Sequence, residues 1–168
     1  MLRPNGPGWN RSVVEEMRLE EFLFGVDRVS TAPLVPALKD VQENCCFYCH
    51  HKITGKPQID HFLPWSRHPD NGIENLVLSD RTCNANKRDL LASAEFVGAW
   101  ALRFDEAEEI GQYLATAAVE TGWERHPHRT LGAARALYLH LPDGTKLWAG
   151  RNKFTDADPA QLQKALAS

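Results

Sequence analysis

The stretch that decides the fold is residues 46–87, CFYCHHKITGKPQIDHFLPWSRHPDNGIENLVLSDRTCNANK. It contains a Cys-x-x-Cys pair, an Asp-His pair, an isolated Asn and a Cys-Asn-x-x-Lys run within 42 residues. Thiolate, imidazole and carboxylate groups are metal ligands and acid–base groups. Their density in so short a segment favours a functional site, around which the rest of the chain is interpreted as packing structure.

The composition of the 168-residue chain is typical of a soluble globular protein, with 43% hydrophobic and 24% charged residues. Every apolar run is far shorter than the ~18 residues of a transmembrane helix, and the N-terminus lacks the apolar region of a secretory signal. We therefore expect a cytoplasmic protein without a membrane partner. The net charge of −3 argues against indiscriminate coating of nucleic acid, although residues 50–90 hold six Lys or Arg against five acids.

Residues 1–44 are predicted to form a helical N-terminal segment. Ser12 and Glu15 make a capping-box pattern at the start of a short amphipathic run. A second helix is expected from about Pro36, because proline is tolerated at a helix start.

Residues 45–92 are predicted to form a β-β-α core. The turn residues at 54–57 are expected to join two short strands as a hairpin. Ser79 or Asp80 would then cap a helix that runs as far as Leu91.

Residues 93–168 are predicted to form a mainly helical extension that packs on this core. The strongest periodic signal lies at 110–121, where apolar residues recur with helical spacing up to Gly122. The elements expected here are a helix from Ser93, a helix over 110–121, a segment at 131–140 that is ambiguous between helix and strand, a short strand at 146–149 and a helix that opens at Asp158.

Two groups outside the main motifs have competing interpretations. Trp65 could touch the site or the substrate, but core packing is the favoured interpretation. The basic residues between Arg125 and Arg129 could contact a DNA backbone, but a solvated connector is favoured.

Three cysteines have the spacing of a structural zinc site. A Cys-x-x-Cys turn places two thiolates about one ion diameter apart, and a third cysteine at a helix start can extend the site. A small segment with short strands buries little surface, so such a metal would stabilise the fold. Cys46, Cys49 and Cys83 fit this description, with reduced cysteines lacking a metal as the alternative. The fourth ligand stays open between Asp80, His50, His51 and Cys45.

A second set of residues offers oxygen and imidazole groups. Asp60 and Asn84 supply the hard oxygen ligands that suit Mg²⁺ or Mn²⁺. A neutral imidazole at His61 can accept a proton from water. Lys87 and Arg88 are predicted to contact a substrate phosphate, with solvated helix charges as the alternative.

The pairs and spacings of this second set resemble a known family. Asp60-His61, then Asn75, then the run at 83–87 resemble the HNH endonuclease motif in its His-Asn-Asn form, on the ββα-metal fold. The resemblance implies that His61 is the general base and that Asp60 and Asn84 hold the catalytic ion. It also implies that Asn75 braces the loop between strand and helix and helps to orient His61.

The same resemblance implies that the cysteines form a zinc knuckle, in which Asp80 stands where relatives usually have Cys or His. The expected fold class is α+β, with a small ββα-metal core, a zinc knuckle and helical flanks. The expected cofactors are Mg²⁺, replaceable by Mn²⁺ or Ni²⁺, and a structural Zn²⁺. The expected partners are double-stranded DNA and a protein that supplies target recognition, in a bacterial or phage setting. The alternative is a zinc-stabilised module that binds nucleic acid or protein without cutting.

Overall fold

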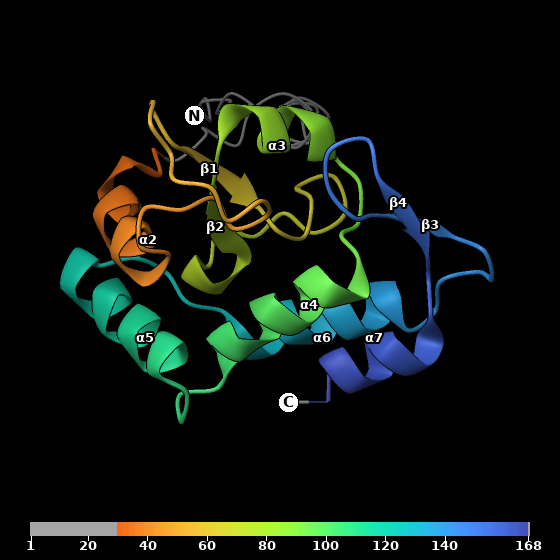
Figure 1. Cartoon of the computed structure of the whole chain (residues 1–168). Helices are drawn as coiled ribbons and strands as arrows, with labels where there is room; N and C mark the ends of the chain where they lie inside the picture. Colours follow the sequence, from red (N-terminus) through yellow and green to blue (C-terminus); the bar gives the residue numbers. More distant parts are fainter. Residues whose placement is uncertain (1–29, 168) are drawn as a thin grey trace, which may run out of the picture. The chain divides into compact units, whose positions relative to one another are not determined.

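The described part of the chain combines helices with two-stranded sheets, and a run of helices separates one sheet from the other (Figure 1). The computed structural model describes residues 30–167, so the helix predicted from Ser12 lies outside the described residues. None of the described helices has the length and apolar character needed to cross a membrane. The elements are α2 (Val35–Val41), β1 (Gln58–His61), β2 (Leu76–Ser79), α3 (Arg81–Lys87), α4 (Ala94–Ala101), α5 (Glu109–Thr121), α6 (Pro127–Tyr138), β3 (Lys146–Trp148), β4 (Phe154–Asp156) and α7 (Pro159–Ala165). Short 3₁₀ turns lie at Ala32–Leu34, Ile73–Asn75 and Leu102–Phe104. The expected α+β class is thereby confirmed.

The first sheet pairs β1 with β2 in antiparallel register, with His61 opposite Leu76. The predicted hairpin around residues 54–57 is wrong, since β1 pairs with β2, while the residues before this turn form an isolated bridge between Cys45 and Lys52. All four side chains of β2 are buried. The burial of this largely apolar strand favours its pairing with β1, although the two strands are far apart in the sequence. A loop therefore separates the two strands.

Helix α3 follows β2 directly, so the order is again strand, strand and helix, but β2 is a strand that the sequence analysis did not predict. The Asp80 side chain caps the helix by accepting hydrogen bonds from the backbone N–H groups of Thr82 at 2.7 Å and Cys83 at 2.9 Å. The helix ends short of the predicted Leu91, because Arg88 has a left-handed φ of 52°.

The C-terminal elements agree with the sequence in most places. The helix predicted over 110–121 is confirmed as α5, and Gly122 ends it with a left-handed φ of 64°. The ambiguous segment at 131–140 is helical for most of its length, as part of α6, which begins at Pro127 within the predicted connector. Asp158 caps α7 as predicted. Strand β4 escapes prediction because its side chains are all exposed and show no apolar alternation.

Aromatic rings join the central segment to helix α4 and strand β3. Phe62 stacks on Trp100 with 4.4 Å between ring centroids, and Tyr48 packs edge-on against Trp148 at 4.9 Å. Trp100 and Trp148 are fully buried. The favoured interpretation of Trp65 as a core residue is wrong, because 39% of its surface is exposed in the loop after β1.

Buried Asp70 joins that loop to the start of α6. Its carboxylate accepts hydrogen bonds from His126 Nδ1 at 2.7 Å, Arg129 Nη2 at 3.0 Å and the Thr130 hydroxyl. Burial alone raises the pKa of Asp70, but the bonds from Thr130, Gly72 and His126 and the charge of Arg129 outweigh it and lower the pKa to about 2. The basic residues before and within α6 are therefore an ion-paired anchor, which corrects the interpretation as a solvated connector.

This anchor predicts an acid-dependent loss of stability. Asp70→Asn is expected to lower the free energy of unfolding at neutral pH by about 2 kcal/mol, at about 1.4 kcal/mol per unit of pKa. Because the folded-state pKa lies below the ordinary 3.8, this contribution is present above about pH 4 and is lost as the pH falls toward 2. Urea unfolding from pH 7 to pH 2 should show the two stabilities converge.

The exposed Asp143→Asn serves as the matched control and should stay close to wild type throughout. A stability difference between wild type and Asp70→Asn that is constant over this pH range contradicts the assignment.

Candidate functional site

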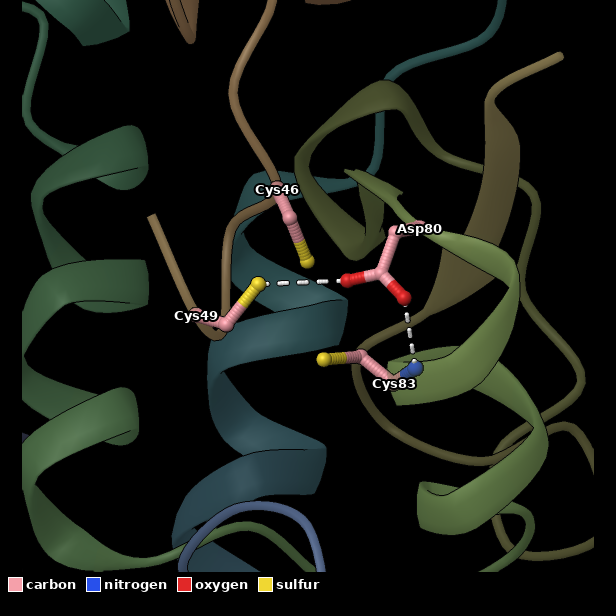
Figure 2. A group of neighbouring side chains, drawn as sticks. All are labelled: Cys46, Cys49, Asp80 and Cys83. Atoms are coloured by element: carbon pink, nitrogen blue, oxygen red, sulfur yellow. Dashed lines mark hydrogen bonds between the residues drawn. The ribbon is translucent and has the colours of Figure 1, made fainter. Parts of the chain in front are cut away.

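Three cysteines and one aspartate converge beside the start of α3 (Figure 2). The Sγ atoms of Cys46, Cys49 and Cys83 and a carboxylate oxygen of Asp80 all lie within 4.8 Å of one another. Thiolate ligands of a tetrahedral zinc ion with bonds of about 2.3 Å lie about 3.8 Å apart. The four groups can therefore close on one ion with small movements, and the cluster can hold a structural metal.

Asp80 takes the fourth place in this cluster, ahead of the rivals that the sequence leaves open. One carboxylate oxygen accepts a hydrogen bond from Cys49 Sγ at 3.2 Å, and the other caps α3. Burial alone raises the pKa of Asp80, but the hydrogen bonds from Cys83, Cys46 and Cys49 outweigh it and hold the pKa well below its usual range. The ionised carboxylate can therefore serve as an anionic ligand.

Burial protects two thiols of the cluster, those of Cys46 and Cys83, from ionisation. Burial raises the pKa of the Cys46 thiol to about 11, and it raises the pKa of the Cys83 thiol well above its usual range. Because metal ions bind the thiolate form, these protons leave when a metal binds. A metal ion would thus replace the hydrogen bonds that now join the cluster.

Asp60 is held from two sides in the middle of β1. Its Oδ2 accepts a hydrogen bond from the Tyr48 hydroxyl at 2.6 Å and pairs with the Lys87 ammonium at 2.9 Å. Its Oδ1 accepts no hydrogen bond within the part of the chain that the structure describes. This leaves one hard oxygen available for a divalent cation.

Lys87 occupies a different place from the predicted one. Its side chain is fully buried, and besides pairing with Asp60 it donates to the backbone carbonyl of His61 at 2.9 Å. Burial lowers the pKa of Lys87, and the negative charge of Asp60 opposes this shift. Lys87 therefore forms an internal ion pair with Asp60 in place of the predicted contact with a substrate phosphate. Arg88 is exposed, and its contact with a substrate stays a prediction.

Asn84 lies over the same face of β1 as Asp60. Its Nδ2 donates to Gln58 Oε1 at 2.7 Å. Gln58 and Asp60 are two residues apart on a strand, so their side chains share a face, and Asn84 and Lys87 share a face of α3. Among residues 30–167, nothing donates to Asn84 Oδ1, so the amide presents a free oxygen on the side of the sheet where Asp60 lies.

His61 ends β1 in a half-buried position. Its Nε2 forms a hydrogen bond with Asn71 Oδ1 at 2.9 Å. The ring of Trp65 lies edge-on to the imidazole, with 5.2 Å between centroids. The imidazole is therefore confined by one polar and one aromatic neighbour from the loop after β1.

Asn75 is fully buried and closes that loop. Its Oδ1 accepts from Leu63 N at 2.9 Å, and its Nδ2 donates to the carbonyl oxygens of Leu63 at 3.3 Å and Asp70 at 3.1 Å. Its side chain forms no hydrogen bond with His61 in the described structure. Its position is thus that of a brace within the loop.

Three residues of the site have no role in the sequence analysis. Tyr48 contacts Asp60, Gln58 contacts Asn84 and Asn71 contacts His61. The sequence could have indicated Gln58, because a residue two positions before Asp60 on a strand lies on the same face of the sheet. The other two carry none, since Tyr48 lies within the Cys-x-x-Cys turn and Asn71 within an Asp-Asn-Gly run that predicts a loop.

Residues 46–93 match the family model of HNH endonucleases. This segment is an HNH domain. The match spans the cysteine cluster, β1, β2 and α3, and it confirms the resemblance in the sequence. No curated protein and no solved structure matches the chain. Because HNH domains are in general nuclease domains, nucleic acid is the class of substrate to which the match points.

Cobalt(II) provides a direct test of the cysteine cluster of the HNH domain. The wild-type protein is expected to bind Co²⁺ with the sulfur-to-metal absorption bands of a tetrahedral thiolate site. Cys83→Ser should weaken binding by more than about tenfold, because it removes one of the four ligands. Asp80→Asn should also weaken binding but keep the bands of three thiolates.

Cys45→Ser is the matched control, since Cys45 lies outside the cluster and donates to the carbonyl of Glu43. Loss of the cobalt bands in Cys45→Ser, or wild-type bands and affinity in Cys83→Ser, contradicts the ligand set.

Proposed function

We propose that this protein is a metal-dependent endonuclease that hydrolyses the phosphodiester bonds of DNA. The proposal assigns the general base to His61 and one divalent ion, Mg²⁺, to Asp60 and Asn84. The observation that carries it is a pair of oxygens, Asp60 Oδ1 and Asn84 Oδ1, which accept no hydrogen bond within residues 30–167 and lie on one face of β1 in an HNH domain. A carboxylate and an amide oxygen are the donors that Mg²⁺ prefers, and Mn²⁺ or Ni²⁺ can replace it.

The side chains around these donors have separate tasks. Tyr48 and Lys87 hold Asp60 through its Oδ2, so that its Oδ1 would be the oxygen that holds the ion. Gln58 holds the amide nitrogen of Asn84, which orients the amide oxygen. A bound Mg²⁺ supplies charge stabilisation for the scissile phosphate and the leaving 3′ oxygen. His61 accepts the proton of the attacking water, the bond between phosphorus and the 3′ oxygen breaks, and the leaving 3′ oxygen takes a proton from solvent. The products therefore carry a 5′ phosphate and a 3′ hydroxyl.

The cysteine cluster has a structural task in this proposal. Zinc bound by Cys46, Cys49, Cys83 and Asp80 would fix the start of α3, and with it Asn84. Because Cys83 and Asn84 are adjacent, the structural ion would position the catalytic oxygen without taking part in the reaction.

The proposed substrate is double-stranded DNA in a bacterial or phage setting. The net charge of −3 supports only weak attraction to DNA over the whole surface, so binding should depend on local contacts such as Arg88. A partner protein that supplies target recognition completes the proposal. Binding through phosphate contacts should weaken as salt rises.

Plasmid nicking tests the role of His61. His61→Ala is expected to reduce Mg²⁺-dependent nicking by about 100-fold or more, because a general base contributes about 10²–10⁴-fold. EDTA should abolish the activity of the wild type. The exposed His140→Ala is the matched control and should cut as fast as the wild type. Thermal unfolding of each variant establishes that it is folded.

Two results contradict the proposal. The first is unchanged nicking by His61→Ala, and the second is wild-type nicking that survives EDTA. A wild-type protein that binds DNA but does not cut it with Mg²⁺, Mn²⁺ or Ni²⁺ would instead be the zinc-stabilised binding module.

A further inference from the structure

The imidazole of His61 has one hydrogen-bond partner among the described residues, the side chain of Asn71. The bond joins His61 Nε2 to Asn71 Oδ1 at 2.9 Å. An amide oxygen can only accept, so a neutral imidazole in this bond carries its proton on Nε2. The lone pair then lies on Nδ1, which has no hydrogen-bond partner in the described part of the chain.

We infer that Asn71 is a positioning residue of the proposed nuclease reaction. Its side-chain oxygen fixes His61 in the Nε2–H form, so that Nδ1 is the atom that takes the proton of the attacking water. This inference rests on the proposed function, because it assigns an atom to the general base named there. It also assigns the orienting task to Asn71 and not to Asn75, whose side chain is fully used within its own loop.

Asn71 itself is clamped by residues that follow the HNH match. Its carbonyl oxygen accepts a hydrogen bond from Trp123 Nε1 at 2.7 Å. On one side, Asp70 is bonded to the start of α6; on the other, Ile73 N donates to the carbonyl of Glu124 at 3.2 Å. The backbone around Asn71 is therefore held by the segment between α5 and α6, outside residues 46–93. The C-terminal part of the chain thus positions the general base through Asn71.

The second neighbour of the imidazole limits its rotation. Trp65 lies edge-on to His61 and belongs to the same loop as Asn71. A ring held by a hydrogen bond at Nε2 and by an aromatic contact has little freedom to rotate. An orientation held in this way lowers the cost of reaching the reactive geometry.

Two substitutions separate the hydrogen bond from the shape of the side chain. Asn71→Asp keeps an acceptor oxygen in a side chain of the same shape. Asn71→Leu has a similar volume but no acceptor. In ¹⁵N-labelled full-length protein at a pH where the imidazole is neutral, wild type and Asn71→Asp should show a hydrogen-bonded Nε2–H signal for His61. This signal should be lost in Asn71→Leu, because its Nε2–H then exchanges with water.

Cleavage kinetics with Mg²⁺ and duplex DNA give the second readout. Asn71→Leu is expected to lower kcat by about 10- to 100-fold and to leave KM unchanged, because Asn71 orients the base and does not bind the substrate. Asn71→Asp should retain most of the activity. Trp123→Phe, which removes the N–H donor but keeps an aromatic ring, should also lower kcat without changing KM.

The outcomes distinguish this inference from the proposed function. An Nε2–H signal that persists in Asn71→Leu, or cleavage by Asn71→Leu with wild-type kcat, overturns the role of Asn71. A change confined to KM overturns it as well. A wild-type protein that is inactive but shows the expected pattern of Nε2–H signals overturns the proposed function, while it supports the bond between Asn71 and His61.

Discussion

The carboxylate of Asp80 links the start of α3 to the cysteine cluster. One oxygen binds the backbone N–H groups that open α3, and the other lies within the cysteine cluster. The start of the helix therefore cannot shift without breaking the cluster, and the cluster cannot open without uncapping the helix. This constraint fixes the positions of the later residues of α3. Asn84 and Lys87 reach Gln58 and Asp60 on β1 because the first turn of the helix is fixed.

Burial of the ion pair between Lys87 and Asp60 costs hydration free energy, which hydrogen bonds from neighbouring groups offset. Two charges removed from water lose several kcal/mol of hydration each, and their attraction repays this only with good geometry and further hydrogen bonds. Here Tyr48 and the carbonyl of His61 supply such bonds. Within residues 30–167 the pair leaves the Oδ1 of Asp60 without a hydrogen bond. The pair thus fixes Asp60 in place, and the proposed divalent ion would bind the other oxygen of this carboxylate.

Much of the cysteine cluster could be predicted from local spacing, because its candidate ligands come from a tight turn and from the start of one helix. The convergence of Cys46, Cys49 and Cys83 and the cap at Asp80 follow from such short-range patterns. The partner of β1 could not be predicted, since the burial of β2 across a long loop decides it. The burial of Lys87 and the contact of Asn71 with His61 depend on side-chain placement in three dimensions. No periodic pattern encodes contacts of that kind.

The central claim is that one short helix serves two different metal sites, a sulfur-rich one and an oxygen-rich one. Anomalous diffraction from crystals of the zinc-loaded protein soaked in Mn²⁺ tests it most directly. The account predicts a zinc peak within the cysteine cluster and a separate manganese peak between Asp60 Oδ1 and Asn84 Oδ1. A manganese peak that avoids Asp60 and Asn84 in a well-occupied crystal, or zinc bound away from Cys46, Cys49 and Cys83, would contradict it.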